Sequence, residues 1–529
     1  MLSRGSSIAR NTLEGFGTVE PAASVRSGVP RDRDAIFATD YLRADLAGRS
    51  VRGGAVTLGS QAARFLIQSI STVVLARLLM PEDFGLVAMV MVVVGFAAVF
   101  QDMGFSWATV QSPRITHDQV SALFWIQIVV TSGLAAGVAL SAPLVAAFYD
   151  EPRLTAIGYA LSSLFILHGV AAQHLAILRR QMRFGAMAVV QVFSLLASVV
   201  LAILVALRGG GYWAVVTHQV ASPAVAAILL WSVTGWRPGV PRRRANIGSL
   251  VSFGSYLTAS SFLNYFTKQA DKALIGFFAG PAQLGLYSKA YSLFKLPIAQ
   301  LNGPLNSVAM PALSRLHDRP DEYRRFYLRL VQGLAYVSMP LVATVAAVSD
   351  LLIPLVLGEQ WTGAARVFQM LALAGLVTPV LWTAGWVNQS MGRADRQLRW
   401  SLLSDPLYVL SFVIGVRWGA VGVAAAFAVT ILLLWLPTMA YAFRITTIEL
   451  SDFMRIISPP AVLTVVAFGA AYAVVRMAPF DDWITLASAL LASISIVGFV
   501  GFAWPNTRRD IKVLATMRTH LKRAASPSQ

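Results

Sequence analysis

The 529-residue chain contains no cysteine and few charged residues. Without cysteine it can form no disulfide framework and no iron–sulfur cluster, and it has no thiol chemistry. Charged residues make up 13% of the sequence, roughly half of what a soluble protein carries. Hydrophobic residues make up 56%, and the mean hydropathy is +0.64. The apolar runs continue without alternation for the ~20 residues that a membrane-spanning helix needs, which excludes both a soluble protein and a β-barrel.

Sequence motifs for nucleotide or metal chemistry are also missing. No lysine follows a glycine, so the chain has no Gly-x-x-x-x-Gly-Lys phosphate-binding loop. The six histidines are dispersed without ligand spacing, and there is no His-Glu-x-x-His motif. Asp481-Asp482 is the only adjacent aspartate pair, and it lies at the tip of a predicted loop. We therefore expect no cofactor, no metal site and no nucleic-acid partner, and we expect a chain that is not an enzyme.

Long apolar segments follow one another from about residue 54 onward, which predicts an all-α polytopic membrane protein. Pro340, Asp350, Pro354 and Glu359 interrupt one region, 340–361, where we expect a broken helix. The fourteen predicted spans are 55–79, 86–107, 120–148, 154–176, 186–207, 212–235, 250–279, 284–310, 329–349, 364–390, 397–416, 418–441, 458–476 and 484–504.

The predicted spans divide into two six-helix lobes and two further helices. Residues 1–50 lack a signal-peptide core and are expected to form a disordered cytoplasmic tail. The remaining divisions are an N-lobe at 51–236, a linker at 237–249, a C-lobe at 250–441, two helices at 442–505 and a basic tail at 506–529.

The charges of the connecting loops predict the orientation in the membrane. If the N-terminus is cytoplasmic, so are the even-numbered connections and the C-terminal tail. These hold most of the basic residues, in clusters such as 179–183, 242–244 and 315–329. The opposite connections are poor in arginine and hold Glu82, Asp83 and other acidic residues. Because arginine and lysine concentrate in cytoplasmic loops, the pattern predicts that both termini are cytoplasmic.

A repeat with an offset of 200 residues relates the two lobes. Pro81 and Gly85 recur as Pro281 and Gly285. The same offset pairs polar residues of spans one and seven, which lie on one helix stripe in each span. The pairs are Ser60 with Ser260, Arg64 with Asn264, Gln68 with Lys268, Ser71 with Asp271 and Thr72 with Lys272. These stripes either line a cavity or are polar contact faces between helices.

Lysines concentrate in one apolar helix pair, residues 254–304. Only six lysines occur in the chain, and four lie here: Lys268, Lys272, Lys289 and Lys295. A charge at the bilayer centre costs roughly 2.5–3.5 kcal/mol, so these side chains are expected to face the protein interior or a wet cavity. Lys289 is nearer the predicted outer end, where a lysine can reach the interface instead.

The candidate substrate site is a cationic cavity between the lobes. Lysine and arginine bind phosphate, and aromatic rings beside them suit sugars or isoprenoid chains, although most aromatic residues simply pack. The candidate cavity residues are Arg64, Gln68, Asn264, Lys268, Lys272, Tyr291 and Lys295. Three acidic residues could couple transport to an ion or neutralise a nearby cation: Asp102, Asp271 and Asp405. The cation beside Asp102 would be Arg64.

Several segments in order resemble a known family. They are Leu75-Ala-Arg-Leu-Leu-Met-Pro-Glu-Asp-Phe-Gly-Leu86, Asp102-Met-Gly-Phe105, Leu178-Arg-Arg-Gln-Met-Arg-Phe184, Gly211-Tyr-Trp-Ala214 and Leu357-Gly-Glu-Gln-Trp361. The set resembles the Wzx-type polysaccharide and lipopolysaccharide flippases of the multidrug/oligosaccharidyl-lipid/polysaccharide exporter superfamily. The resemblance covers about residues 53–504.

The resemblance implies a two-lobed exporter that works by alternating access in the bacterial inner membrane. Its substrate would be an undecaprenyl-diphosphate-linked oligosaccharide for exopolysaccharide or lipopolysaccharide biosynthesis, and polymerase and export proteins of the same pathway are candidate partners. Two alternatives are an ion-coupled drug or cation exporter, whose cavity should be acidic, and a membrane polymerase or ligase of lipid-linked glycans, which should carry a long outer loop.

Overall fold

The computed structural model describes residues 34–37, 46–102, 104–112, 115–240, 248–477 and 481–503, without the side chains of 248–264 and of some other residues. These residues form helices and no strand, which confirms the all-α prediction. The long helices are α1 (Leu46–Leu78), α2 (Pro81–Ala98), α4 (His117–Tyr149), α5 (Arg153–Arg180), α6 (Phe184–Leu207), α7 (Tyr212–Thr234), α8 (Gly248–Arg315), α9 (Pro320–Ala347), α11 (Thr362–Leu381), α13 (Ala394–Gly415), α14 (Gly419–Phe443), α15 (Leu450–Met477) and α16 (Asp482–Ala503). The short elements are η1 (Ala35–Phe37), α3 (Phe105–Gln111), α10 (Ser349–Leu357), η3 (Glu359–Trp361), α12 (Thr383–Ser390) and η4 (Val416–Trp418).

Helix α8 contains two of the predicted spans. Its backbone leaves helical geometry at Gly280, with φ 80° and ψ 177°, which is a conformation that glycine adopts without strain. The break divides α8 into a first limb, 248–279, and a second limb, 281–315. Each of the fourteen predicted spans then overlaps a helix. Ten helical stretches of the described chain are long and apolar enough to cross a membrane, so the number fourteen remains a prediction.

Some predicted boundaries were wrong. The second predicted span starts at residue 86 and runs to 107, whereas α2 starts at Pro81 and ends at Ala98, and α3 follows separately. Proline is favoured in the first turn of a helix, because its missing N–H would have no intrahelical partner there. The predicted span 364–390 is divided into α11 and α12 at Trp382, three residues after Pro379.

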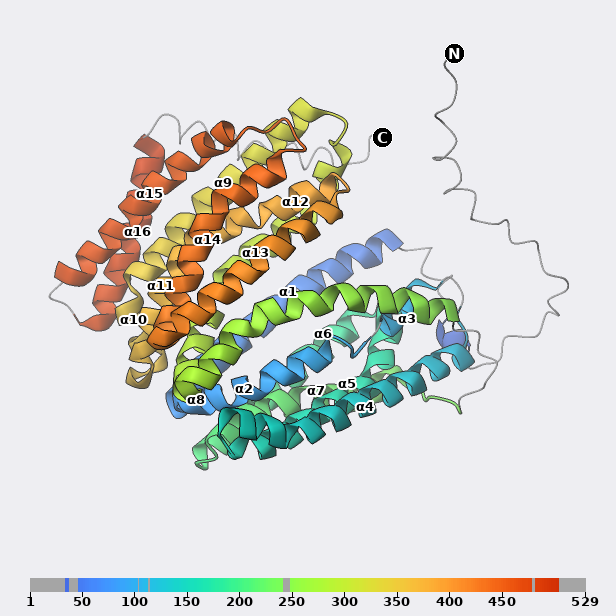
Figure 1. The fold of residues 1–529 in the computed structure, drawn as a ribbon. Helices are drawn as coiled ribbons and strands as arrows, with labels where there is room; N and C mark the ends of the chain where they lie inside the picture. The colour runs from blue at the N-terminus through green and yellow to red at the C-terminus, as the bar shows by residue number, and fades with distance from the viewer. Residues whose placement is uncertain are drawn as a thin grey trace, which may run out of the picture.

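The helices form two bundles that meet at one end and diverge at the other (Figure 1). The N-bundle is α1–α7, and the C-bundle is the second limb of α8 with α9–α16. The first limb of α8 lies along α2, where Tyr265 donates a 2.5 Å hydrogen bond to the Val92 carbonyl. We call the ends of the molecule the closed end, where the bundles meet near Gly280, and the open end, where they diverge.

The hydrophobic cores follow the same division. The largest core crosses from one bundle to the other and includes Leu86 and Ala76 of the N-bundle with Trp361 and Phe368 of the C-bundle. Near the open end each bundle has a core of its own. The core of the N-bundle surrounds Leu123 and also includes Phe37 of the segment 34–37. The core of the C-bundle surrounds Tyr327 and Phe453. Shared burial therefore holds the bundles together at the closed end.

Backbones touch where α2 crosses the second limb of α8. A Cβ atom on Gly85 would overlap the Pro281 carbonyl, and a Cβ atom on Gly285 would overlap the Pro81 carbonyl. These are the residues that the 200-residue repeat equates, so the two halves meet here through reciprocal contacts of equivalent residues. Small residues allow such close approach between membrane helices.

The segment 34–37 is folded against the N-bundle, within the region where the sequence predicted a tail. Phe37 is buried, and its carbonyl accepts a hydrogen bond from Arg180 Nε at 3.0 Å. The Asp34 carboxylate accepts from the backbone N–H of His117 at 2.7 Å. Helix α1 also begins earlier than predicted, at Leu46.

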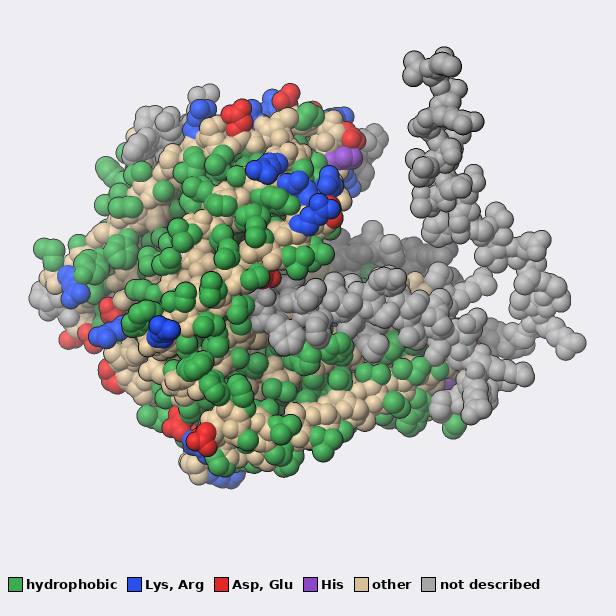
Figure 2. All heavy atoms as spheres, viewed as in Figure 1, with side chains coloured by type: hydrophobic (Ala, Val, Ile, Leu, Met, Phe, Trp, Pro, Cys, Tyr) green, Lys and Arg blue, Asp and Glu red, His purple; other side chains and the backbone are tan. Residues whose placement is uncertain are grey.

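On the face shown in Figure 2, the described charged side chains gather toward the two ends, and hydrophobic side chains cover most of the surface between them. At the open end, arginines cluster around the α5–α6 connection, at Arg179 and Arg183, and around the α8–α9 connection, at 315–325. The closed end holds Glu82, Glu151 and Arg153, joined by ion pairs of 2.6 and 2.7 Å from the Arg153 guanidinium. That guanidinium holds the pKa of Glu151 below its ordinary value. Such an arrangement fits a helix bundle with its long axis across a bilayer.

We predict that Gly85→Ala destabilises the protein by about 1–3 kcal/mol, because the added methyl group forces two backbones apart. Gly133→Ala is the matched control, since a Cβ at Gly133 meets no atom within 4 Å. The measurement is thermal unfolding of the purified proteins in one detergent. Equal unfolding temperatures for Gly85→Ala and the native protein would show that the crossing is not tightly packed.

Candidate functional site

A cavity of about 360 Å³ lies at the seam of the two bundles, near the closed end. Its walls come from α2, α7 and both limbs of α8. The polar residues that line it are Gln219, Gln269, Lys272, Ser288, Lys289 and Ser292. Among the described residues of the wall, two are cationic and none carries a carboxylate. The cavity is therefore a positively charged space inside an apolar helix assembly.

Lys272 enters the cavity from the first limb of α8. Its ammonium group donates a hydrogen bond of 2.9 Å to the side-chain oxygen of Gln269, one turn earlier. It also lies 5.9 Å from the centre of the Tyr291 ring on the second limb. A neutral amide and a ring face orient the ammonium group without cancelling its charge. Lys272 is thus available to attract an anion.

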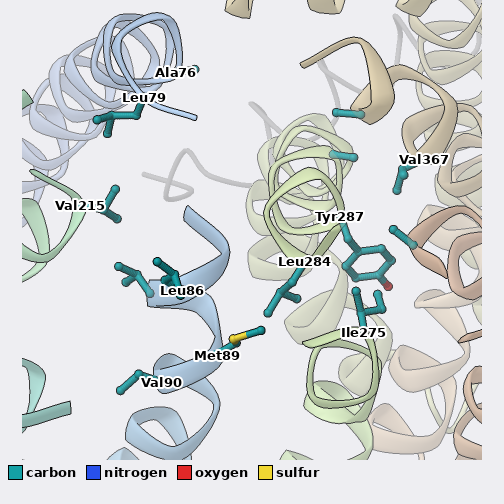
Figure 3. Packing of buried hydrophobic residues seen from close by; sticks show 14 of the residues in the cluster. Ala76, Leu79, Leu86, Met89, Val90, Val215, Ile275, Leu284, Tyr287 and Val367 are labelled. Carbon is teal, nitrogen blue, oxygen red and sulfur yellow. The ribbon is translucent and has the colours of Figure 1, made fainter. Parts of the chain in front are cut away.

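Asp271 is next to Lys272 but points into a different environment. It is 4% exposed, and its Oδ2 accepts a 2.7 Å hydrogen bond from the Tyr287 hydroxyl on the second limb. Its Oδ1 accepts from the backbone N–H of Lys272 at 2.8 Å. Figure 3 shows Tyr287 beside Ile275 in the packed layer between the limbs. The Asp271–Tyr287 hydrogen bond therefore ties the two limbs of α8 together.

Tyr291 and Lys295 extend the cationic site along the second limb. The Lys295 ammonium lies 4.6 Å from the centre of the Tyr291 ring, and Tyr291 stacks on Tyr287 with a centroid separation of 5.8 Å. The ring of Tyr291 thus lies near two lysine side chains, one from each limb. The structure brings together three of the predicted residues: Lys272, Tyr291 and Lys295.

Lys289 is a cavity residue: of the two positions that the sequence left open for it, the protein interior and the membrane interface, the structure shows the interior. It is only 9% exposed, and its ammonium lies 3.9 Å from the centre of the Phe84 ring and 5.4 Å from that of Trp361. Those two rings pack edge to face with centroids 5.3 Å apart. Lys289 therefore fills a cation–π site made by α2 and η3, two elements distant in the sequence.

The predicted residues of the first half do not line this cavity. Arg64 is exposed on α1 and donates to the Gln191 side chain at 3.0 Å. Gln68 is exposed on the same helix. Asp102 accepts from the Ser106 hydroxyl at 2.5 Å at the start of α3, so the expected Arg64–Asp102 pair is not formed. Neither Arg64 nor Gln68 lines the described cavity.

Three further predicted residues are less informative. Asp405 is half-buried on α13, where the Ser404 hydroxyl lies 3.5 Å from its carboxylate. Asn264 and Lys268 belong to the first limb of α8, and their side chains lie outside the described residues. Gln219, Gln269 and Lys289 were not among the predicted site residues, although Lys289 belongs to the lysine-rich helix pair from which the site was predicted.

The closed end of the cavity is sealed by contacts of α1 with the C-bundle. Arg77 donates to the carbonyls of Leu355 and Val356 at 2.6 and 3.0 Å. Trp361 Nε1 donates to the Ala76 carbonyl at 2.8 Å. These bonds satisfy carbonyls at helix ends that lack intrahelical partners. They join the end of α1 to α10 and η3, where the buried Ala76 and Trp361 also belong to the shared hydrophobic core.

The sequence also matches a model of a known family. The family is described as "Polysaccharide biosynthesis protein", and the match covers residues 74–366. The chain is 28% identical over 384 residues to teichuronic acid biosynthesis protein TuaB of Bacillus subtilis, covering 71% of this chain and 79% of that protein. It is 24% identical over 361 residues to lipopolysaccharide biosynthesis protein WzxC of Escherichia coli, covering 67% and 73%.

Two solved structures share the fold. The lipid II flippase MurJ in an inward closed conformation aligns with a TM-score of 0.65 at 11% identity, over 85% of this chain and 99% of that chain. An inward-facing multidrug resistance transporter of the MATE family aligns with a TM-score of 0.56 at 12% identity, over 75% and 95%.

We predict that Tyr287→Phe lowers stability by about 1–3 kcal/mol, because it leaves a buried Asp271 oxygen without its donor. Tyr159→Phe is the control, since Tyr159 is 52% exposed. Thermal unfolding in detergent measures both variants. If the two variants unfold at the same temperature, the Asp271–Tyr287 bond does not stabilise α8.

Proposed function

Because the chain belongs to the polysaccharide biosynthesis protein family, we propose that it moves lipid-linked oligosaccharide units to the periplasmic side of the bacterial inner membrane. The lipid carrier is undecaprenyl diphosphate, and the units serve exopolysaccharide or lipopolysaccharide biosynthesis. The names of the relatives and the fold shared with a lipid II flippase support this transport role. Polymerase and export proteins of the same pathway would use the product.

The charge of the seam cavity carries the proposal. A diphosphate is a compact anion, and Lys272 and Lys289 place two cations on the cavity wall beside neutral donors. In a site away from bulk water, an anion gains more from such groups than it does at the surface. A site for a cationic drug would need carboxylates instead, and the described wall has none. The lysines therefore favour a phosphate-bearing substrate over the alternative of cation export.

Alternating access follows from the two unequal ends. The substrate enters between the diverging bundles at the open end and reaches the lysines at the seam. The bundles then close at the open end while the seal of Arg77, Trp361 and their carbonyl partners breaks. The Gly85–Gly285 crossing adjoins the cavity wall at Phe84, where it acts as the pivot of this rocking motion.

The positive-inside rule assigns the open end to the cytoplasm. Arginine-rich loops follow α5 and precede α9 at the open end, whereas the closed end carries Glu82, Asp350 and Asp482. The conformation is then inward-facing, which is the orientation needed to load a substrate that is built in the cytoplasm.

Labelling of single introduced cysteines tests this orientation. Because the chain has no cysteine of its own, only the introduced thiol can react. Asp318→Cys at the open end and Asp481→Cys at the closed end place thiols at exposed positions. In intact spheroplasts, a membrane-impermeant maleimide is expected to label Asp481→Cys alone and to label Asp318→Cys only after permeabilisation. The reverse pattern would show that the orientation is opposite.

Transport is tested in a strain without the gene. We expect that strain to lose polymer export and to accumulate lipid-linked repeat units in the cytoplasmic leaflet. Lys272→Ala should reproduce this defect at normal protein levels, with export lowered roughly tenfold or more, whereas Lys272→Arg keeps the charge and should retain export. Arg208→Ala, which removes an exposed charge at the closed end, is the control.

Two results would contradict the proposal. Normal export without the gene would show that the protein does not move the repeat unit. Normal export by Lys272→Ala would remove this lysine from substrate binding, even if the deletion itself abolished export.

A further inference from the structure

A second, larger cavity lies inside the C-bundle at the open end. Its volume is about 620 Å³, and its walls come from the second limb of α8 and from α12, α13 and α14. None of the described residues that line it is charged. The wall instead combines indole and phenol rings with side-chain amides and hydroxyls. This chemistry differs from that of the lysine-lined seam cavity.

Four aromatic side chains form the apolar part of the wall: Trp382, Trp386, Trp400 and Tyr441. Trp400 stacks on Tyr441 with ring centroids 5.0 Å apart and an interplanar angle of 26°. On the Tyr441 side, Arg396 lies 4.3 Å from the ring centre and donates to the Tyr441 carbonyl at 2.8 Å. These contacts hold the Trp400 and Tyr441 rings in place before any ligand binds, so these two rings lose little conformational entropy on binding.

Side-chain amides form the polar part of the wall. Gln389 and Gln397 face each other with an N–O distance of 3.3 Å. Asn388 is 4% exposed and donates to the Ala384 carbonyl at 3.1 Å. Its own carbonyl oxygen is buried and has no hydrogen-bond partner among the residues described. A buried acceptor without a donor is costly, which indicates that a ligand or water supplies the missing donor.

We infer that this C-bundle cavity binds the sugar part of the lipid-linked substrate, an inference that rests on the proposed transport function. A pyranose ring has apolar C–H faces that pack on aromatic rings, and its hydroxyls both donate and accept, as amides do. An uncharged wall with rings and amides selects the neutral glycan, whereas the lysine-lined seam cavity selects the diphosphate.

The two cavities are placed so that one molecule can occupy both. The second limb of α8 carries Ser292 in the wall of the seam cavity and Gly303 in the wall of the C-bundle cavity. Eleven residues of helix separate them, or about 17 Å at 1.5 Å per residue. A glycan of a few sugars spans such a distance from its diphosphate.

Binding to the purified full-length protein tests the inference with two separate probes. One is the repeat-unit oligosaccharide released from the lipid carrier of the host strain by mild acid, which lacks the diphosphate. The other is undecaprenyl diphosphate without sugar. Calorimetry is expected to show saturable binding of each to the native protein. Trp400→Ala and the double variant Gln389→Ala, Gln397→Ala should weaken glycan binding about tenfold or more and leave undecaprenyl diphosphate binding unchanged.

The controls separate this inference from the proposed function. Trp418→Ala removes a 69% exposed indole at the far end of α13 and should leave both affinities unchanged. The glutamines are exposed, so their variant tests the site even if Trp400→Ala fails to fold. Native protein that binds undecaprenyl diphosphate but not the released glycan, or variants with undiminished glycan affinity, would overturn the inference alone. Export that persists without the gene would overturn the proposed function.

Discussion

The backbone crossing of α2 with α8 is the contact on which the rest of the structure depends. Gly85 and Gly285 let each helix reach the other's proline carbonyl, and a side chain larger than hydrogen at either site would separate them. Around this point the hydrophobic core is shared by both bundles, whereas the cores near the open end remain separate. In this conformation the bundles are joined by burial at one end and are apart at the other, as one state of an alternating-access cycle requires.

The charged residues are placed as a molecule with one closed and one open end requires. The lysines lie immediately inside the joined end, held by ring faces and neutral amides, so that their positive charge is not cancelled by a carboxylate in the described wall. The seal beyond them includes hydrogen bonds from Arg77 and Trp361 to main-chain carbonyls. Water can replace these bonds when this end opens, whereas the apolar residues around them, which belong to the shared core, lose their burial. A bound anion can shift the equilibrium between the inward-facing and outward-facing conformations if its affinity for one of them is higher.

The sequence predicted much of the fold but only part of the site. Apolar runs revealed the helices, and the 200-residue offset equated Gly85 with Gly285, yet equivalence in a repeat does not say that two residues touch. The structure brings Lys272, Tyr291 and Lys295 together. The two lysines were predicted because charges are rare in an apolar helix pair, and Tyr291 because it shares a helix face with Lys295. The position of Lys289 was left open, because its partners, Phe84 and Trp361, are distant in the sequence. Arg64 was expected at the cavity because it lies on a polar stripe, but it pairs with Gln191 on α6.

The central claim is that the two ends open in alternation about the glycine crossing. Spin labels on introduced cysteines test it directly, because the chain has none of its own. One pair, at Arg179 and Asp318, spans the open end, and another, at Arg208 and Trp418, spans the closed end. When the lipid-linked oligosaccharide of the host is added in nanodiscs, electron resonance distances should shorten across the open end and lengthen across the closed end. Distances that stay fixed, or that change in the same direction at both ends, would contradict the account.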